Sequence, residues 1–135
     1  MNTGKINIRV KEKTQELSVH IELSEDNTVW LTKHQIAELF GVYIQTVMAG
    51  LKTVRRNGLF KDDSVKYHCY LNTQGIHCTV ELYNLDLIIT LSFYMKGGVC
   101  HLFRGWLCNQ AKKQLLSTTV PRSPILIRFN RVELL

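Results

Sequence analysis

Polar and basic residues between positions 43 and 56 have side chains that can contact nucleic acid. They are Tyr43, Gln45, Thr46, Lys52, Arg55 and Arg56. A glutamine amide can pair with an adenine edge, and a hydroxyl can contact a base or a phosphate. Lysine and arginine neutralise phosphates. These residue types predict contact with nucleic acid, provided that one element presents them on an exposed face.

The element that must position these side chains is predicted over residues 31–56. Thr32 can cap a first helix, because its hydroxyl can accept a hydrogen bond from an unpaired backbone N–H. Gly41 suits a chain reversal at positive φ. Apolar residues recur at helical spacing on both sides of this glycine: Ile36, Ala37, Phe40, Val47, Leu51 and Val54. The pattern predicts a helix-turn-helix whose second helix can enter a DNA major groove.

Two alternatives to DNA binding stay open for this pair of helices. An αα-hairpin that binds no DNA shows the same glycine turn and apolar faces. Ile44, Met48, Ala49 and Gly50 are unusual on a base-reading helix, so this face could instead pack against protein. Gly50 lowers helix propensity by about 1 kcal/mol relative to alanine. We expect it to be tolerated where another backbone approaches closely.

The charge of the chain favours a polyanionic partner. The 135 residues have a net charge of +6, and 45% of them are hydrophobic. The pI is about 9.3, which is compatible with nucleic-acid binding. No apolar run reaches the roughly 18–20 residues that span a membrane. The N-terminus also lacks a secretory hydrophobic segment, so a cytoplasmic protein without membrane association is expected.

Strand-like alternation flanks the predicted helices. Residues 5–10 and 17–23, with a short third strand over residues 28–31, predict an N-terminal β-meander. Residues 64–71 and 76–82 predict a β-hairpin around the loop 72–75. A hairpin after a helix-turn-helix is typical of a winged helix. Lys66 would then be a phosphate contact on the wing.

Two helices are predicted after the hairpin. Asn84 can cap a mostly apolar helix over residues 85–96, and Gly97-Gly98 ends it. An amphipathic helix over residues 100–116 should direct one face toward the core: Phe103, Trp106, Leu107, Ala111 and Leu115. Residues 125–129 could form a strand after two prolines. The expected fold is therefore α+β, with one winged-helix-like domain over residues 1–116 and a tail over 117–135.

Cysteine and histidine occur as three adjacent pairs, His68-Cys69, His77-Cys78 and Cys100-His101. With a four-residue hairpin loop, Cys69 would face Cys78, and both histidines would lie on the other face of the hairpin. One metal ion could not then bind all four side chains of the hairpin. A zinc site from Cys69, Cys78, Cys100 and His101 stays open as an alternative. The favoured interpretation is packed cysteines and surface histidines, with no metal and no cofactor.

The residues VWLTKHQIAELFGVYIQTV, LYNLDLIITLSFYMKGG and HLFRGWL together resemble the RhuM-like family. These proteins occur in bacterial genomes near pathogenicity islands and mobile elements, and the resemblance covers roughly residues 28–108. It is nearest to virulence-associated, Bacteroides-type mobile-element members. The resemblance implies a DNA-binding role. Family members usually have polar or basic residues where this chain has Tyr43 and Ile44.

These observations predict a protein that binds double-stranded DNA as a transcriptional regulator or mobile-element accessory factor. A homodimer is expected because helix-turn-helix proteins usually bind paired half-sites, with the tail or the Trp106 helix as its surface. No small-molecule ligand is expected. No catalytic motif is present, so an enzyme is not expected. A protein-interaction adaptor and a small enzyme with a Cys–His pair remain the alternatives.

Overall fold

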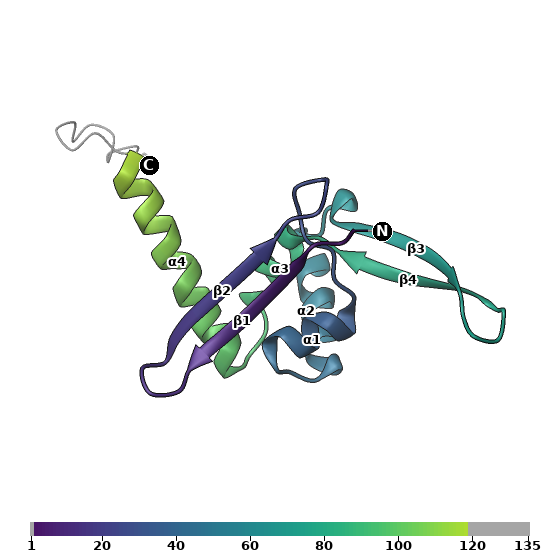
Figure 1. Ribbon diagram of the computed structural model, residues 1–135, viewed down its shortest axis with the longest axis horizontal. Helices are drawn as coiled ribbons and strands as arrows, with labels where there is room; N and C mark the ends of the chain where they lie inside the picture. Colours follow the sequence, from purple (N-terminus) through teal and green to yellow (C-terminus); the bar gives the residue numbers. More distant parts are fainter. Residues whose placement is uncertain (1, 119–135) are drawn as a thin grey trace. The chain divides into compact units, whose positions relative to one another are not determined.

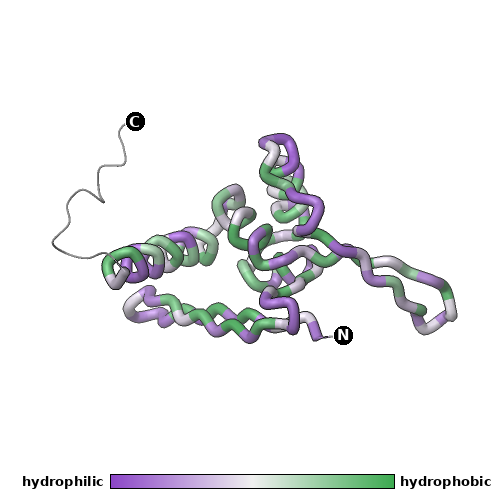
Figure 2. The backbone as a smooth tube through the Cα atoms, turned by 90° about the horizontal axis from the view of Figure 1, so that it is seen from above, coloured by the Kyte–Doolittle hydropathy of each residue, from purple (hydrophilic) through white to green (hydrophobic). Residues whose placement is uncertain are grey.

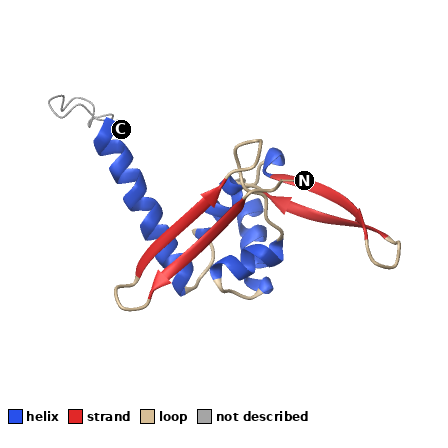
Figure 3. Cartoon of the chain, viewed as in Figure 1, coloured by secondary structure: helices blue, strands red, loops and turns tan. Residues whose placement is uncertain are grey.

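The computed structural model describes residues 2–118, which form a mixed α+β fold (Figures 1 and 3). This part of the chain contains two antiparallel β-hairpins and four helices. The chain forms two compact units, of which the first ends at Arg104 and the second begins at Gly105. The predicted α+β class is confirmed.

The first hairpin consists of β1 (Lys5–Lys11) and β2 (Glu16–Glu22). Its register pairs Ile8 with Val19, so the apolar side chains of both strands share one face. Figure 2 shows this alternation along both strands. The strands that the sequence predicted over residues 5–10 and 17–23 are therefore confirmed.

The predicted third strand over residues 28–31 is wrong, and the N-terminal sheet is a hairpin instead of a meander. In this segment, the Trp30 N–H donates to the Thr3 carbonyl, and Leu31 pairs with Tyr83 at the end of the second hairpin. Val29, Trp30 and Leu31 are all buried, unlike the alternating residues of a strand with one solvent face. The segment is a buried link between β2 and α1.

The helices α1 (Lys33–Phe40) and α2 (Ile44–Arg56) follow this connector. Thr32 accepts from the Gln35 N–H, while the Gln35 side chain accepts from the Thr32 N–H, which completes a capping box. Gly41 has φ +63° and ψ +38°, the left-handed conformation that glycine tolerates best. The predicted cap, turn and second helix are confirmed.

The second hairpin consists of β3 (Val65–Leu71) and β4 (His77–Tyr83), which follow the short 3₁₀ helix η1 (Asp62–Ser64). The predicted register is wrong by one residue, because Cys69 faces Thr79 and Tyr70 faces Cys78. Asn72 and Ile76 still pair through the Asn72 N–H, and Gly75 adopts φ +76°. This geometry is typical of a turn with a glycine bulge, which changes the strand offset by one residue.

Helix α3 (Leu85–Ser92) begins as predicted, with Asn84 accepting from the Leu87 N–H, but it ends four residues earlier than residue 96. Arg104 explains this early end. Its guanidinium donates to the carbonyls of Ser92 and Met95, at 2.5 and 3.1 Å. These carbonyls therefore need no partner from a further helical turn.

Helix α4 (Gly98–Thr118) contains the predicted helix over residues 100–116. Of the five residues that were predicted to face the core, only Phe103 is buried. Trp106 and Leu107 are half-buried, and the predictions for Ala111 and Leu115 are wrong because both are exposed. The compact unit that contains the core extends only to Arg104, which explains the difference. The predicted strand over residues 125–129, and most of the predicted tail, lie outside the described residues.

The core of the first unit lies where α1, α2 and α3 meet, and the first turns of α4 complete it. Each of these elements contributes fully buried apolar side chains: Phe40, Ile36, Val47, Val54, Leu87, Ile88, Leu91 and Phe103. Val29 and Tyr83 are also fully buried. The Phe40 and Phe103 rings pack edge to face, with centroids 5.4 Å apart. This core fixes which face of α2 remains at the surface.

Candidate nucleic-acid interface

Helix α2 has one buried and one exposed face. Val47, Gly50, Leu51 and Val54 are buried. The opposite side chains recur at intervals of three and four residues and are exposed: Gln45, Met48, Ala49, Lys52 and Arg56. From Gln45 to Arg56 this face extends for about 16 Å along the helix. It can therefore contact a ligand that is larger than a small molecule.

The first turn of α2 presents the candidate base-reading residues. Tyr43 is the N-cap residue, and its side chain is 82% exposed and makes no capping hydrogen bond. Gln45 is exposed in the first helical turn, and Thr46 beside it is half-buried. A recognition helix contacts base edges mainly through its N-terminal residues. Of the three residues that the sequence predicted, Tyr43 and Gln45 are exposed enough for such contacts, and Thr46 is less exposed.

The last turn of α2 gathers positive charge. Lys52, Arg55 and Arg56 are exposed, and the Arg55 guanidinium lies 3.9 Å from the centre of the Phe60 ring. Within residues 2–118 the one ion pair that the structure records is His20–Glu22, on the first hairpin. No carboxylate of this part of the chain is therefore paired with the three cations. Their charge is available to a phosphate, with Arg55 preoriented by the aromatic ring.

Close packing at Gly50 holds α2 against the core. A Cβ atom at this position would lie 3.1 Å from Met95 Cγ and 3.2 Å from Leu91 Cδ2. The neighbours that the sequence predicted as a close backbone are therefore side chains of α3 and of the turn after it.

Comparison of the chain with family models, with curated proteins and with solved structures finds no match.

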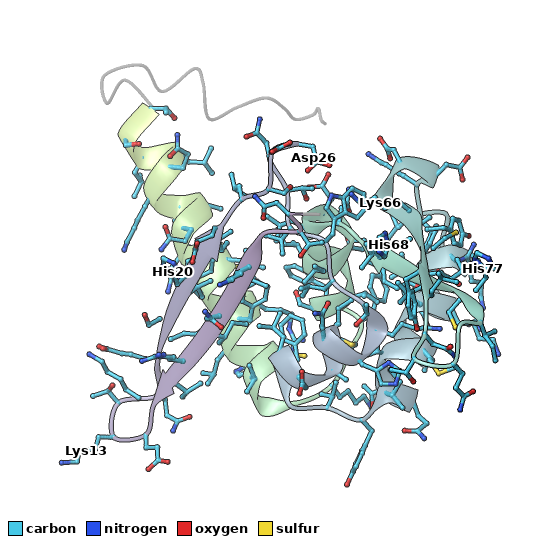
Figure 4. All side chains as sticks on the ribbon, turned by 45° about the vertical axis from the view of Figure 1, so that its right-hand side comes forward. Lys13, His20, Asp26, Lys66, His68 and His77 are labelled. Atoms are coloured by element: carbon cyan, nitrogen blue, oxygen red, sulfur yellow. The ribbon has the colours of Figure 1, made fainter. Side chains whose placement is uncertain are left out.

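Lys66, the predicted phosphate contact on the second hairpin, lies in a different environment. Its ammonium is 4.2 Å from the centre of the Trp30 ring, and its side chain is half-buried. The Trp30 indole donates to Asp26 at 2.9 Å, and the Ser24 hydroxyl donates to the other oxygen of the same carboxylate. Figure 4 shows Lys66 and Asp26 in one region near the base of β3. The structure therefore places Lys66 in a cluster with Asp26 and Trp30.

These hydrogen bonds hold the pKa of Asp26 below its usual value. The Ser24 hydroxyl has the largest effect, followed by the Trp30 indole, and the nearby Lys66 charge acts in the same direction. Sequence reasoning missed this cluster. Asp26 precedes Trp30 by four residues, but only the turn over residues 24–28 brings their side chains together.

The cysteine and histidine pairs do not form the zinc site that the sequence left open. With the observed register, Cys69 and Cys78 lie on opposite faces of the second hairpin, so the prediction that they share a face is wrong. His68 and His77 are likewise on opposite faces (Figure 4). Across residues 2–118, no group of three His, Cys, Asp or Glu side chains is placed to hold a metal ion.

A cavity of about 380 Å³ lies between β1 and α1, where Ile6, Leu31 and Leu39 are among its lining residues. It shares no residue with the exposed face of α2.

Among the described residues, no helix has both the length and the apolar character that a membrane span requires. The exposed face of α2 is the candidate site on which the sequence pattern and the exposure of the side chains agree.

Proposed function

We propose that the chain binds double-stranded DNA, with α1, the Gly41 turn and α2 acting as a helix-turn-helix. In this proposal α2 lies in the major groove, which is about 12 Å wide. Gln45 and Tyr43 then contact base edges or the nearest phosphates. Arg55 and Arg56, at the other end of the helix, contact the DNA backbone. The protein would act as a transcriptional regulator or a mobile-element accessory factor, and the proposal includes no catalytic activity.

One observation carries the proposal: α2 exposes a polar N-terminal turn and three cations on a helix whose other face is buried. The cations are not paired with carboxylates within the described chain. The net charge of +6 supports a polyanionic partner. The short motifs that resemble RhuM-like proteins imply the same function, although no family model matches the chain. Lys66 is half-buried beside Trp30, whereas the cations of α2 are exposed, so α2 is proposed as the main contact.

A salt titration tests this proposal. Fluorescence anisotropy would measure binding to a labelled duplex of random sequence between about 50 and 400 mM NaCl. For DNA binding, the logarithm of the association constant should fall linearly with the logarithm of salt concentration. In the Arg55→Ala/Arg56→Ala variant two phosphate contacts are lost, so the slope should become shallower by about 1.8.

A matched control makes the same change in net charge on α4 instead of on α2. Lys112→Ala/Lys113→Ala also removes two adjacent, exposed cations, and these lie on α4. This variant should keep the wild-type slope. Equal slopes for the wild type and the arginine variant would refute the proposed anchor. Absence of wild-type binding at every salt concentration would refute DNA binding and favour the adaptor alternative.

A further inference from the structure

The second hairpin exposes large apolar side chains on both of its faces. Tyr67 and Leu71 lie on one face and are 66% and 61% exposed. Tyr70 lies on the other face and is 46% exposed, and Ile76 in the loop is 55% exposed. Only the base of the hairpin, at Leu82 and Tyr83, is buried. Most of the hairpin therefore makes no core contact that would account for these residues.

The composition of the hairpin does not suit a DNA-contacting wing. From Tyr67 to Tyr83 the chain has no lysine or arginine, and its one charged residue is Glu81. Lys66, at the start of β3, is held over the Trp30 ring. Because DNA affinity depends mainly on cations that contact phosphates, this segment has little to offer a duplex.

The same features suit a second copy of the chain. Each copy has a net charge of +6, so two copies repel one another over most of their surface. The uncharged outer part of the hairpin is a place where two copies can approach without that repulsion. In a two-stranded sheet each strand also keeps one unpaired edge, and β3 has no charged side chain after Lys66 to protect that edge.

The exposed apolar area on one face of the hairpin is modest. Tyr67 and Leu71, which share a face, present about 250 Å² of apolar surface, if a fully exposed large side chain presents about 200 Å². A stable interface buries about 800 Å² per partner, so the strand edges and neighbouring polar groups would supply the rest. We propose that the β3–β4 hairpin is a self-association arm, through which two copies pair around a two-fold axis. This inference goes beyond DNA binding and does not depend on it.

Sedimentation equilibrium of the full chain without DNA tests the proposal, at protein concentrations from about 1 to 200 µM. The wild type should show a reversible monomer–dimer equilibrium. The Tyr67→Ser/Leu71→Ser variant should raise the dimer dissociation constant by about 100-fold, because a two-fold dimer loses each contact twice. The matched control is Leu59→Ser/Phe93→Ser, which removes an exposed leucine and an exposed aromatic residue outside the hairpin. This control should dimerise as the wild type does.

Three results would overturn the proposal. The first is a wild type that stays monomeric over the whole concentration range. The second is a hairpin variant that dimerises normally while its far-UV circular dichroism matches the wild type. The third is an equal loss of dimer in the hairpin and control variants. If the hairpin variant stays folded but loses affinity for duplex DNA without any change in mass, the arm contacts DNA instead of a second copy.

Discussion

The N-terminus of α3 offers a quantitative test of how distant residues stabilise this fold. Two side chains satisfy its first backbone N–H groups: Asn84 accepts from Leu87, and the Thr28 hydroxyl accepts from Leu85 at 3.0 Å. Thr28 precedes Leu85 by 57 residues. A Thr28→Val substitution keeps the shape of the side chain but removes the acceptor. A partly buried N–H then loses its partner, which should lower the free energy of unfolding by about 1–2 kcal/mol.

Urea denaturation followed by far-UV circular dichroism would measure this change. The matched control is Thr90→Val, the same substitution within α3. The Thr90 hydroxyl donates to the carbonyl four residues earlier, and that carbonyl already serves the helix. Its removal leaves no backbone group without a partner, so the control should change stability by no more than about 0.5 kcal/mol.

The free energies of unfolding of the two valine variants show whether the Thr28 hydroxyl caps α3. If Thr28→Val and Thr90→Val lower the stability equally, then the Thr28 hydroxyl does not cap α3. The denaturant dependence of the unfolding free energy should stay unchanged in both variants, because neither substitution alters the surface that unfolding exposes. A changed denaturant dependence would mean that the substitution alters the compactness of the native or the denatured state, and not one hydrogen bond alone.

Two further predictions concern titratable side chains. The pKa of Asp26 is lowered in the folded state, so its contribution to stability is present above its usual pKa of 3.8 and is lost as the pH falls through the folded-state pKa. An Asp26→Asn variant should therefore lose less stability than the wild type between about pH 5 and pH 2. Thermal unfolding across that range would measure the loss. An equal loss in both proteins would contradict a lowered pKa of Asp26 in the folded state. Cys100 is buried, and burial raises the pKa of its thiol, so in the native protein Cys69 and Cys108, which are exposed, should react with a thiol reagent well before Cys100. Modification of Cys100 at the rate of Cys69 without denaturant would contradict its placement in the core.

The proposed DNA interface and the proposed self-association arm use different elements of the same unit. The proposed arm is in β3 and β4, and the proposed DNA contacts are on α2. In a two-fold dimer the two copies of α2 would be available to paired half-sites, as helix-turn-helix proteins commonly require. The two proposals can therefore be tested separately, one by the salt dependence of binding and the other by mass.

Local features of this fold could be predicted from sequence because their partners are close along the chain. Thr32 and Asn84 each cap a helix through an N–H three residues away, and Gly41 needs only its own backbone conformation. The predicted register of the second hairpin was wrong because of the conformation of its loop. Gly75 at φ +76° adds a bulge to the loop, and residue types alone did not distinguish this loop from a four-residue one.

The sequence by itself determined the helices α1 and α2, the two hairpins and the apolar face of α2, because helical spacing, strand alternation and caps act over a few residues. It also supplied the residues proposed for DNA contact. The tertiary structure decided which of those residues are usable. It placed Lys66 over Trp30, stopped α3 with Arg104 and left the apolar hairpin exposed. Each of these outcomes joins residues distant in sequence or depends on what the rest of the chain covers. Spacing along one segment carries no information about either.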